Sequence, residues 1–328
     1  MNYIFHTVIV IVITAIFIMG CNNPDDPLIN GVDSDWFTQI SGVNNNLKSV
    51  QFLDSYNGYA IGSSFPNDTG KFLWTSNSGQ TWYKGGVVAR DTNMTGLFFF
   101  NLFLGIAIGN HGKIAKTYNG GLNWVSVVSG TTNFLTSIVF TDINTGFVSG
   151  YLGTVLKTTT AGNSWQTQSV PTSQDLFYIT NSSSQELYAV GVAGTILYSN
   201  DGGSFWFFRD SSAFTNNLTC IKFVNNLTGF TSGMNGTILK TTNKGISWAV
   251  QTSGTSEWLH SLFFISETTG IAVGDGGVIL RTTNGGSNWD MVQSPTGNFL
   301  RSVYFFDSYS GWAVGENGTI IHTTSGIY

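Results

Sequence analysis

Short apolar runs recur along the chain, and polar turns separate them. The run at 259–264 leads through a polar turn to a second run that ends at Gly274, and the run at 300–305 leads in the same way to Gly315. A tight Gly hairpin, a third run and an Asn-x-Gly turn complete the unit. Alternation, β-branched and aromatic residues, and Gly or Asn turns predict strands. Each unit therefore contains four predicted strands in about 42 residues, the size of one propeller blade.

Seven tryptophans mark the repeat. They are Trp36, Trp82, Trp124, Trp165, Trp206, Trp248 and Trp289, separated by 46, 42, 41, 41, 42 and 41 residues. Six of them end the frame Ser/Thr-x-Asn/Asp/Thr-x-Gly-x-x-Trp. We predict a structural role for this frame. Its polar side chain bonds backbone N–H groups in a tight turn, its Gly supplies a positive φ, its hydroxyl bonds across the hairpin, and its Trp locks the turn to the adjacent sheet.

The two ends of the repeat region complement each other. The last unit begins near Gly318 and stops just before its Trp is due, whereas Trp36 begins a strand with no unit ahead of it. Pairing these two segments completes a seventh blade and removes exposed sheet edges. We therefore predict an all-β fold, a single seven-bladed β-propeller of four-stranded blades over residues 35–328, closed by the N-terminal Trp36 strand.

The N-terminus has the pattern of an export signal. Residues 8–19 are almost wholly apolar, but 12 residues are too few to cross a bilayer. The run ends in Ile-Met-Gly-Cys21, which resembles a bacterial lipobox and implies a lipid on Cys21. The first seven residues contain no Lys or Arg, so a plain secretory signal is the alternative. We expect a lipoprotein-type signal peptide at 1–20 and a tether at 21–34.

This pattern predicts an extracytoplasmic protein. The expected location is the bacterial outer membrane, on the periplasmic side or the cell surface, with membrane contact only through the lipid; otherwise the chain is secreted. Charged residues are 9% of the chain and the net charge is −5, with 13 Lys and Arg. A nucleic-acid binder needs a denser basic footprint. We expect a monomer.

The cysteines and histidines indicate no metal or disulfide chemistry. Cys220 lies in an apolar strand pattern and is predicted to be a buried, inert thiol. His111, His260 and His322 lack the spacing of metal ligands, and no calcium-loop or phosphate-cradle motif is present. We therefore expect no metal and no cofactor.

The Trp frame resembles the Asp-box, or BNR, repeat. The longer unit reads Gly-Thr-Ile-Leu-Lys-Thr-Thr-Asn-x-Gly-x-Ser-Trp, then Leu-x-Ser-x-x-Phe-Phe and Ala-Val-Gly, and it is similar to the photosystem II stability/assembly factor family over about residues 35–328. The resemblance implies a seven-bladed propeller that binds a protein partner without catalysis. Here such a protein would assist the assembly or stability of an envelope complex.

Two glycan-directed functions remain as alternatives. Sialidases also carry Asp boxes, but they need an arginine triad, and the chain has only Arg90, Arg209, Arg281 and Arg301. A xyloglucanase-like glycosidase needs two facing carboxylates. The candidate acids are Asp175, Glu257, Asp275 and Glu316. Carbohydrate binding or hydrolysis is thus the second hypothesis.

One propeller face is more variable than the other. The start of each first strand recurs near the channel mouth, and aligning the units gives Lys48, Thr95, Thr136, Asp175, Thr219, His260 and Arg301. The neighbouring hairpins add His111, Tyr151, Met234, Asp275 and Glu316. We predict partner binding by the charged members of this set, which are Lys48, Asp175, His260, Arg301, His111, Asp275 and Glu316. The alternative is that they are ordinary solvated loop residues.

Overall fold

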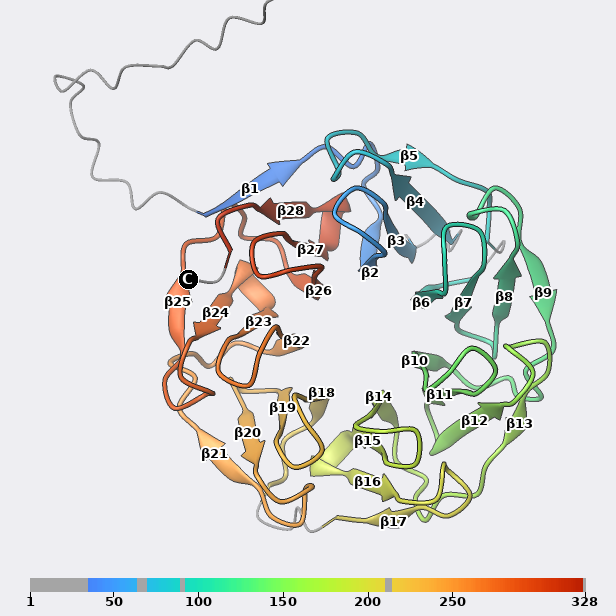
Figure 1. The fold of residues 1–328 in the computed structure, drawn as a ribbon, viewed down its shortest axis with the longest axis vertical. Coiled ribbons are helices and arrows are strands. Elements are labelled where there is room, and N and C mark those ends of the chain that lie inside the picture. Colours follow the sequence, from blue (N-terminus) through green and yellow to red (C-terminus); the bar gives the residue numbers. More distant parts are fainter. Residues whose placement is uncertain (1–34, 64–69, 89–91, 210–213, 327–328) are drawn as a thin grey trace, which may run out of the picture. The chain divides into compact units, whose positions relative to one another are not determined.

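The computed structural model describes residues 35–63, 70–88, 92–209 and 214–326. The predicted signal peptide and tether, with Cys21, lie outside these ranges, and so does Arg90. The described strands form seven antiparallel sheets of four, arranged as blades around a ring (Figure 1). The predicted seven-bladed all-β propeller is confirmed. Within the described ranges, no helix has the length and apolar character needed to cross a bilayer.

Blades 1 to 3 follow one another along the chain. Blade 1 contains β2 (Asn46–Phe52), β3 (Gly58–Ser63), β4 (Lys71–Thr75) and β5 (Tyr83–Lys84). Blade 2 contains β6 (Met94–Phe99), β7 (Gly105–Gly109), β8 (Ile114–Thr117) and β9 (Val125–Val127). Blade 3 contains β10 (Leu135–Phe140), β11 (Gly146–Gly150), β12 (Thr154–Thr158) and β13 (Gln166–Thr167).

Blades 4 to 6 repeat this plan. Blade 4 contains β14 (Leu176–Asn181), β15 (Leu187–Gly191), β16 (Ile196–Ser199) and β17 (Phe207–Phe208), with the 3₁₀ turn η1 (Val192–Gly194). Blade 5 contains β18 (Leu218–Phe223), β19 (Gly229–Gly233), β20 (Ile238–Thr241) and β21 (Ala249–Gln251). Blade 6 contains β22 (Leu259–Phe264), β23 (Gly270–Gly274), η2 (Asp275–Gly277), β24 (Ile279–Thr282) and β25 (Asp290–Val292).

Blade 7 is built from both ends of the chain. It contains β26 (Leu300–Phe305), β27 (Gly311–Gly315), η3 (Glu316–Gly318), β28 (Ile320–Thr323) and β1 (Trp36–Gln39). Strand β1 pairs antiparallel with β28, from Trp36 opposite Thr323 to Gln39 opposite Ile320. The N-terminal strand thereby closes the ring as predicted, and no blade edge is left open at the junction.

The Trp frame acts as a turn device. In all six internal copies the frame Gly donates its N–H to the Ser or Thr hydroxyl, at 2.8 to 3.1 Å. These glycines have φ between +72° and +85°, which is the left-handed region. Asn77 Oδ1 accepts the Thr81 N–H at 2.9 Å. The hydroxyl therefore bonds inside the turn, not across the hairpin.

The frame tryptophans join neighbouring blades. Trp82 is 7% exposed and shares an apolar cluster with Leu73 of its own blade and with Trp312 and Ile320 of blade 7. Trp165 lies in the same way between blades 2 and 3. The core of the molecule is thus a ring of apolar clusters between blades, which leaves the inner strands free to surround a central space.

Candidate functional site

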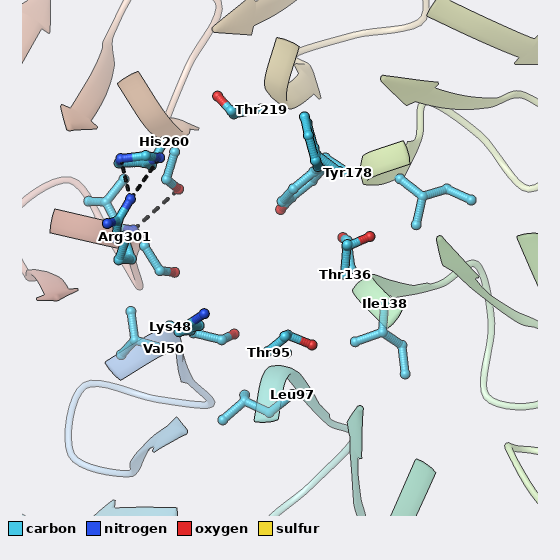
Figure 2. A pocket seen from close by; sticks show the side chains of 18 of the residues that line it. Lys48, Val50, Thr95, Leu97, Thr136, Ile138, Tyr178, Thr219, His260 and Arg301 are labelled. Carbon is cyan, nitrogen blue, oxygen red and sulfur yellow. Dashed lines mark hydrogen bonds between the residues drawn. The ribbon is translucent and has the colours of Figure 1, made fainter. Parts of the chain in front are cut away.

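A cavity of about 590 Å³ lies at the centre of the ring, and the first strand of every blade contributes to its wall. Figure 2 shows side chains from these strands directed into it, with Lys48, His260 and Arg301 on one side and Thr136 and Ile138 on the other. We call this space the channel cavity.

A β-bulge near the start of each first strand directs one side chain into the cavity. The pairing of the first and second strands shifts register at the same place in all seven blades, for example between Leu47 and Ser49. A bulge locally redirects a strand, and bulges are frequent beside functional sites. The bulge residues are Lys48, Thr95, Thr136, Phe177, Thr219, His260 and Arg301, and all seven line the cavity.

Three of these bulge residues tie blades together. Thr95 donates its hydroxyl to the carbonyl of Leu135 at 2.7 Å, and Thr136 donates to Leu176 at 2.7 Å. Thr219 makes the same bond to Leu259, at 2.5 Å. Each bond reaches the next blade. The threonines are thus structural, and the blades without a Thr at this position supply the chemistry of the cavity mouth.

The structure corrects the sequence alignment in blade 4. Leu176 pairs with Gly191, so Phe177 and not Asp175 occupies the bulge position. Asp175 precedes the strand, and its Oδ1 accepts the backbone N–H of Leu152 at 2.9 Å. Phe177 was missed because an apolar residue in a strand is expected to face the core.

The structure separates His111 from the cavity. It lies at the exposed tip of the β7–β8 hairpin with φ +53°. It faces a different surface groove, beside Ser129 and Thr131. His111 therefore does not line the channel cavity, and its role in partner binding stays a prediction.

Four of the predicted residues form one network. Arg301 Nη2 donates to Glu316 Oε1 at 2.5 Å, and Arg301 Nη1 lies 2.5 Å from His260 Nε2. The same His260 atom lies 2.6 Å from Asp275 Oδ1. His260 and Arg301 come from bulges in β22 and β26, whereas Asp275 and Glu316 begin the turns η2 and η3. Lys48 lines the cavity from the next blade.

The charges of this network largely cancel. Burial and the nearby Arg301 lower the pKa of His260 to about 4, against the opposing effect of Asp275. The imidazole is therefore neutral at pH 7. The positive charge of Arg301 lies beside the two carboxylates of Asp275 and Glu316. With Lys48 included, the mouth on this side is polar and nearly balanced.

An aromatic surface lies across the channel from this network. Phe134 and Tyr151 stack with ring centroids 4.8 Å apart, and Tyr151 meets Phe177 edge-on at 6.1 Å. All three line the cavity. Only Tyr151 was included in the sequence alignment, because the pattern gives no sign that Phe134 and Phe177 face the channel.

A lysine lies deeper in the cavity. Lys222 is the fifth residue of β18, and its Nζ atom lies 4.9 Å from the centroid of the Tyr178 ring. Tyr178 and Tyr304 line the same cavity. In the sequence, this residue is marked only by being a lysine within the apolar strand pattern Leu-Thr-Cys-Ile-Lys-Phe. An exposed position at the edge of a sheet would also explain a lysine there. Next to it, Cys220 is a fully buried free thiol, as predicted.

The described residues do not bring an arginine triad, which the sialidase hypothesis needs, together in the channel cavity. Of the described arginines, only Arg301 lines the cavity; Arg209 stacks on Tyr198 at 3.9 Å in blade 4, and Arg281 lies in β24. Among the candidate acids in the described ranges, Glu316 lines the cavity and Asp175, Glu257 and Asp275 do not. Within those ranges no three His, Cys, Asp or Glu side chains are placed to hold a metal ion.

Comparisons with known proteins confirm the resemblance seen in the repeat. Residues 172–242 match the family described as "Photosynthesis system II assembly factor YCF48". A solved structure of YCF48 bound to a D1 peptide is 18% identical with a TM-score of 0.74, and the match covers 88% of this chain and 97% of that one. YCF48 from Cyanidioschyzon merolae is 16% identical with a TM-score of 0.72, over 88% and 98% of the two chains.

The propeller fold is also shared with an enzyme. A virginiamycin B lyase from Staphylococcus aureus is 12% identical with a TM-score of 0.75, over 88% of this chain and 99% of that one. Identities at this level show the fold alone. No curated protein matches the sequence. Function must therefore be argued from the site.

Proposed function

We propose that this chain is a non-catalytic, extracytoplasmic propeller that binds a peptide segment of a protein partner at the mouth of the channel cavity. The main support for the proposal is that two chemically different surfaces face each other across the mouth of the cavity. The network of His260, Asp275, Arg301 and Glu316 offers donors and acceptors, and the aromatic surface of Phe134, Tyr151 and Phe177 offers apolar contact.

A peptide suits such a mouth because it presents backbone amides and side chains together. Aromatic side chains provide large contact areas, and arginine and histidine bond carbonyl or carboxylate oxygens. The similarity to a propeller solved with a peptide bound supports the same class of ligand for this chain. The role that follows is assistance in the assembly or stability of an envelope complex.

The location of the protein is part of the proposal. The lipobox-like segment ending at Cys21 supports lipid attachment and an outer-membrane location, with plain secretion as the alternative. Metabolic labelling with a palmitate analogue tests it: the wild type should incorporate label and Cys21→Ser should not. Equal labelling of the two proteins would contradict the anchor.

The binding test uses residues 22–328 as bait on detergent-solubilised native envelope, followed by a peptide array of the captured protein. The variant Lys48→Ala/His260→Ala/Arg301→Ala should lose one stoichiometric partner and its array peptide. The matched control Lys84→Ala, on the exposed edge strand β5, should retain both. Undiminished binding of the array peptide by the triple variant would overturn the proposal.

Carbohydrate binding is the second candidate, and the exposed aromatic surface favours it, because sugar rings also stack on aromatic side chains. A glycan array run on the same preparation separates the two functions. A glycan bound by the wild type and lost in Tyr151→Ala, without any protein partner, would replace the peptide proposal. Asp175, Asp275 and Glu316 would then be tested as acids.

A further inference from the structure

Lys222 is a half-buried cation that lines the channel cavity. It lies in β18, and its ammonium group faces the ring of Tyr178 from the preceding blade. Tyr304 of β26 lines the same part of the cavity, beside Phe263, whose ring centroid is 5.3 Å from that of Tyr304. One ammonium and two phenol groups therefore gather at the inner strands of blades 4, 5 and 7.

Lys222 has no acidic neighbour among the described residues. The described ion pairs join Lys244 to Glu186, and His260 and Arg301 to Asp275 and Glu316. Burial opposes the charge of Lys222, but the tyrosine and cysteine side chains around it raise its pKa. Burial also raises the pKa of Tyr178 and of Tyr304. At neutral pH the group thus holds one ammonium, which only donates hydrogen bonds, and two hydroxyls, which can donate or accept them.

The remaining wall of the cavity mixes apolar and polar side chains. Figure 2 shows Val50, Leu97 and Ile138 directed inward, and Phe98 and Phe263 add aromatic surface. Hydroxyl and amide side chains lie among them. The volume of about 590 Å³ is in the range of small-molecule sites, roughly 300–1,000 Å³. A concave wall of apolar side chains with polar groups among them is typical of a ligand site.

We propose that the channel cavity binds an organic carboxylate with an apolar body, its oxygens held by the Lys222 ammonium and the hydroxyls of Tyr178 and Tyr304. An ammonium group at a cavity wall with no carboxylate beside it attracts an anion, and a carboxylate supplies both the opposite charge and acceptors for the ammonium and the two hydroxyls. Phosphate or sulfate would match the donors but not the apolar part of the wall. This site shares the cavity with the mouth but uses none of the mouth residues.

Calorimetric titration of the propeller with 3-phenylpropanoate tests the proposal, with 3-phenylpropanamide as the uncharged analogue. The carboxylate should bind at least about tenfold more tightly than the amide, because a charge-assisted hydrogen bond is lost in the amide. Lys222→Met should weaken carboxylate binding by at least about tenfold. Lys84→Met, on the outer edge, should leave binding unchanged.

A second variant keeps the proposal testable if Lys222→Met fails to fold. Tyr304→Phe removes one hydroxyl and should weaken carboxylate binding several-fold while the amide is unaffected. Equal affinity for acid and amide, or wild-type affinity in a folded Lys222→Met protein, would overturn the assignment.

The carboxylate has two sources, a free small molecule or a peptide C-terminus. A tripeptide ending in Phe, with a free or an amidated C-terminus, separates them. Binding of 3-phenylpropanoate assigns the site to small molecules. Binding of only the free-carboxylate tripeptide assigns it to a chain end. Failure of both carboxylates to bind at millimolar concentration refutes the site.

Discussion

The Nζ atom of Lys116 lies 2.7 Å from the carbonyl oxygen of Ala161, in the Trp-frame turn of the next blade. It also donates to Asn163 Oδ1 at 2.7 Å. Lys157 and Lys240 reach the corresponding carbonyls of Gly202 and Gly285, at 2.6 and 2.5 Å. One lysine position of the repeat thus ties neighbouring blades together near the outer edge.

Replacing Lys116 should therefore weaken the junction between blades 2 and 3. The side chain is 3% exposed, and Lys116→Met would leave the two oxygen acceptors without its ammonium. A hydrogen bond to a charged group contributes about 1.5–3 kcal/mol, so we expect a loss of that order in the free energy of unfolding. Urea denaturation measures it. Lys84→Met, on exposed β5, is the control, and equal losses in both variants would refute the role of the bond.

The fold could be predicted from the sequence because its determinants are local and repeated. The frame Thr75, Asn77 and Gly79 forms its own turn, and each further copy repeats the same bonds. The missing Trp in the last unit and the extra one at Trp36 predicted the pairing of β1 with β28. The number of repeats gives the number of blades, so the prediction needed no information about long-range contacts.

The wall of the channel cavity was harder to predict, because a bulge breaks the alternation of strand faces. After the bulge, a first-strand residue no longer faces the side that a period of two predicts. Phe177 and Lys222 both face the channel, and the pattern of apolar and polar residues does not predict this. His260, Arg301, Asp275 and Glu316 were found because charged residues stand out in an apolar repeat, whereas an aromatic residue does not.

The proposed role of Lys222 predicts that its loss weakens binding and leaves stability nearly unchanged. The ammonium is half-buried at the cavity wall, and the described ion pairs do not include it. We expect Lys222→Met to change the free energy of unfolding of the ligand-free protein by less than about 1 kcal/mol, and to remove the stabilisation that 3-phenylpropanoate gives the wild type. Denaturation with and without 3-phenylpropanoate measures both effects. A destabilised, ligand-free Lys222→Met protein would instead make this lysine a structural residue.

His322 should make stability depend on pH. Burial lowers its pKa to about 4, below the ordinary 6.5 of the unfolded chain. Between these values the unfolded state binds the extra proton, so stability is full above about pH 6.5 and falls as the pH drops toward 4. The loss reaches roughly 3 kcal/mol at most, from 1.36 kcal/mol per pKa unit.

The variant His322→Phe isolates this contribution. The ring stacks on Trp312 with centroids 4.5 Å apart, which Phe can retain, although the contact of Nδ1 with Gln39 Nε2 at 3.3 Å is lost. We expect a flatter dependence of the unfolding free energy on pH between 4 and 6.5 than in the wild type. Parallel curves for the two proteins would exclude His322 as the titrating group.

Substitutions at two glycines, Gly121 inside a Trp frame and Gly130 outside it, distinguish the cost of backbone strain from the cost of overpacking. Gly121 and Gly130 have nearly the same φ, +85° and +81°, so an added Cβ carries a similar left-handed cost of about 1–2 kcal/mol at each. At Gly130 the Cβ meets nothing within 4 Å, whereas at Gly121 it would lie 2.0 Å from Cε1 of Phe72.

The ring of Phe72 has no room to give way. It is 2% exposed and packs beside the stacked rings of Tyr59 and Phe99, with centroids 5.8 and 5.7 Å away, and edge-on to Trp124 at 5.3 Å. Overpacking in a core costs about 1–3 kcal/mol, so Gly121→Ala should lose that much more than Gly130→Ala in urea denaturation. Equal losses would mean that the frame Gly is needed only for its backbone angle. A larger loss at Gly121 would show that its missing side chain lets the turn close against the neighbouring blade.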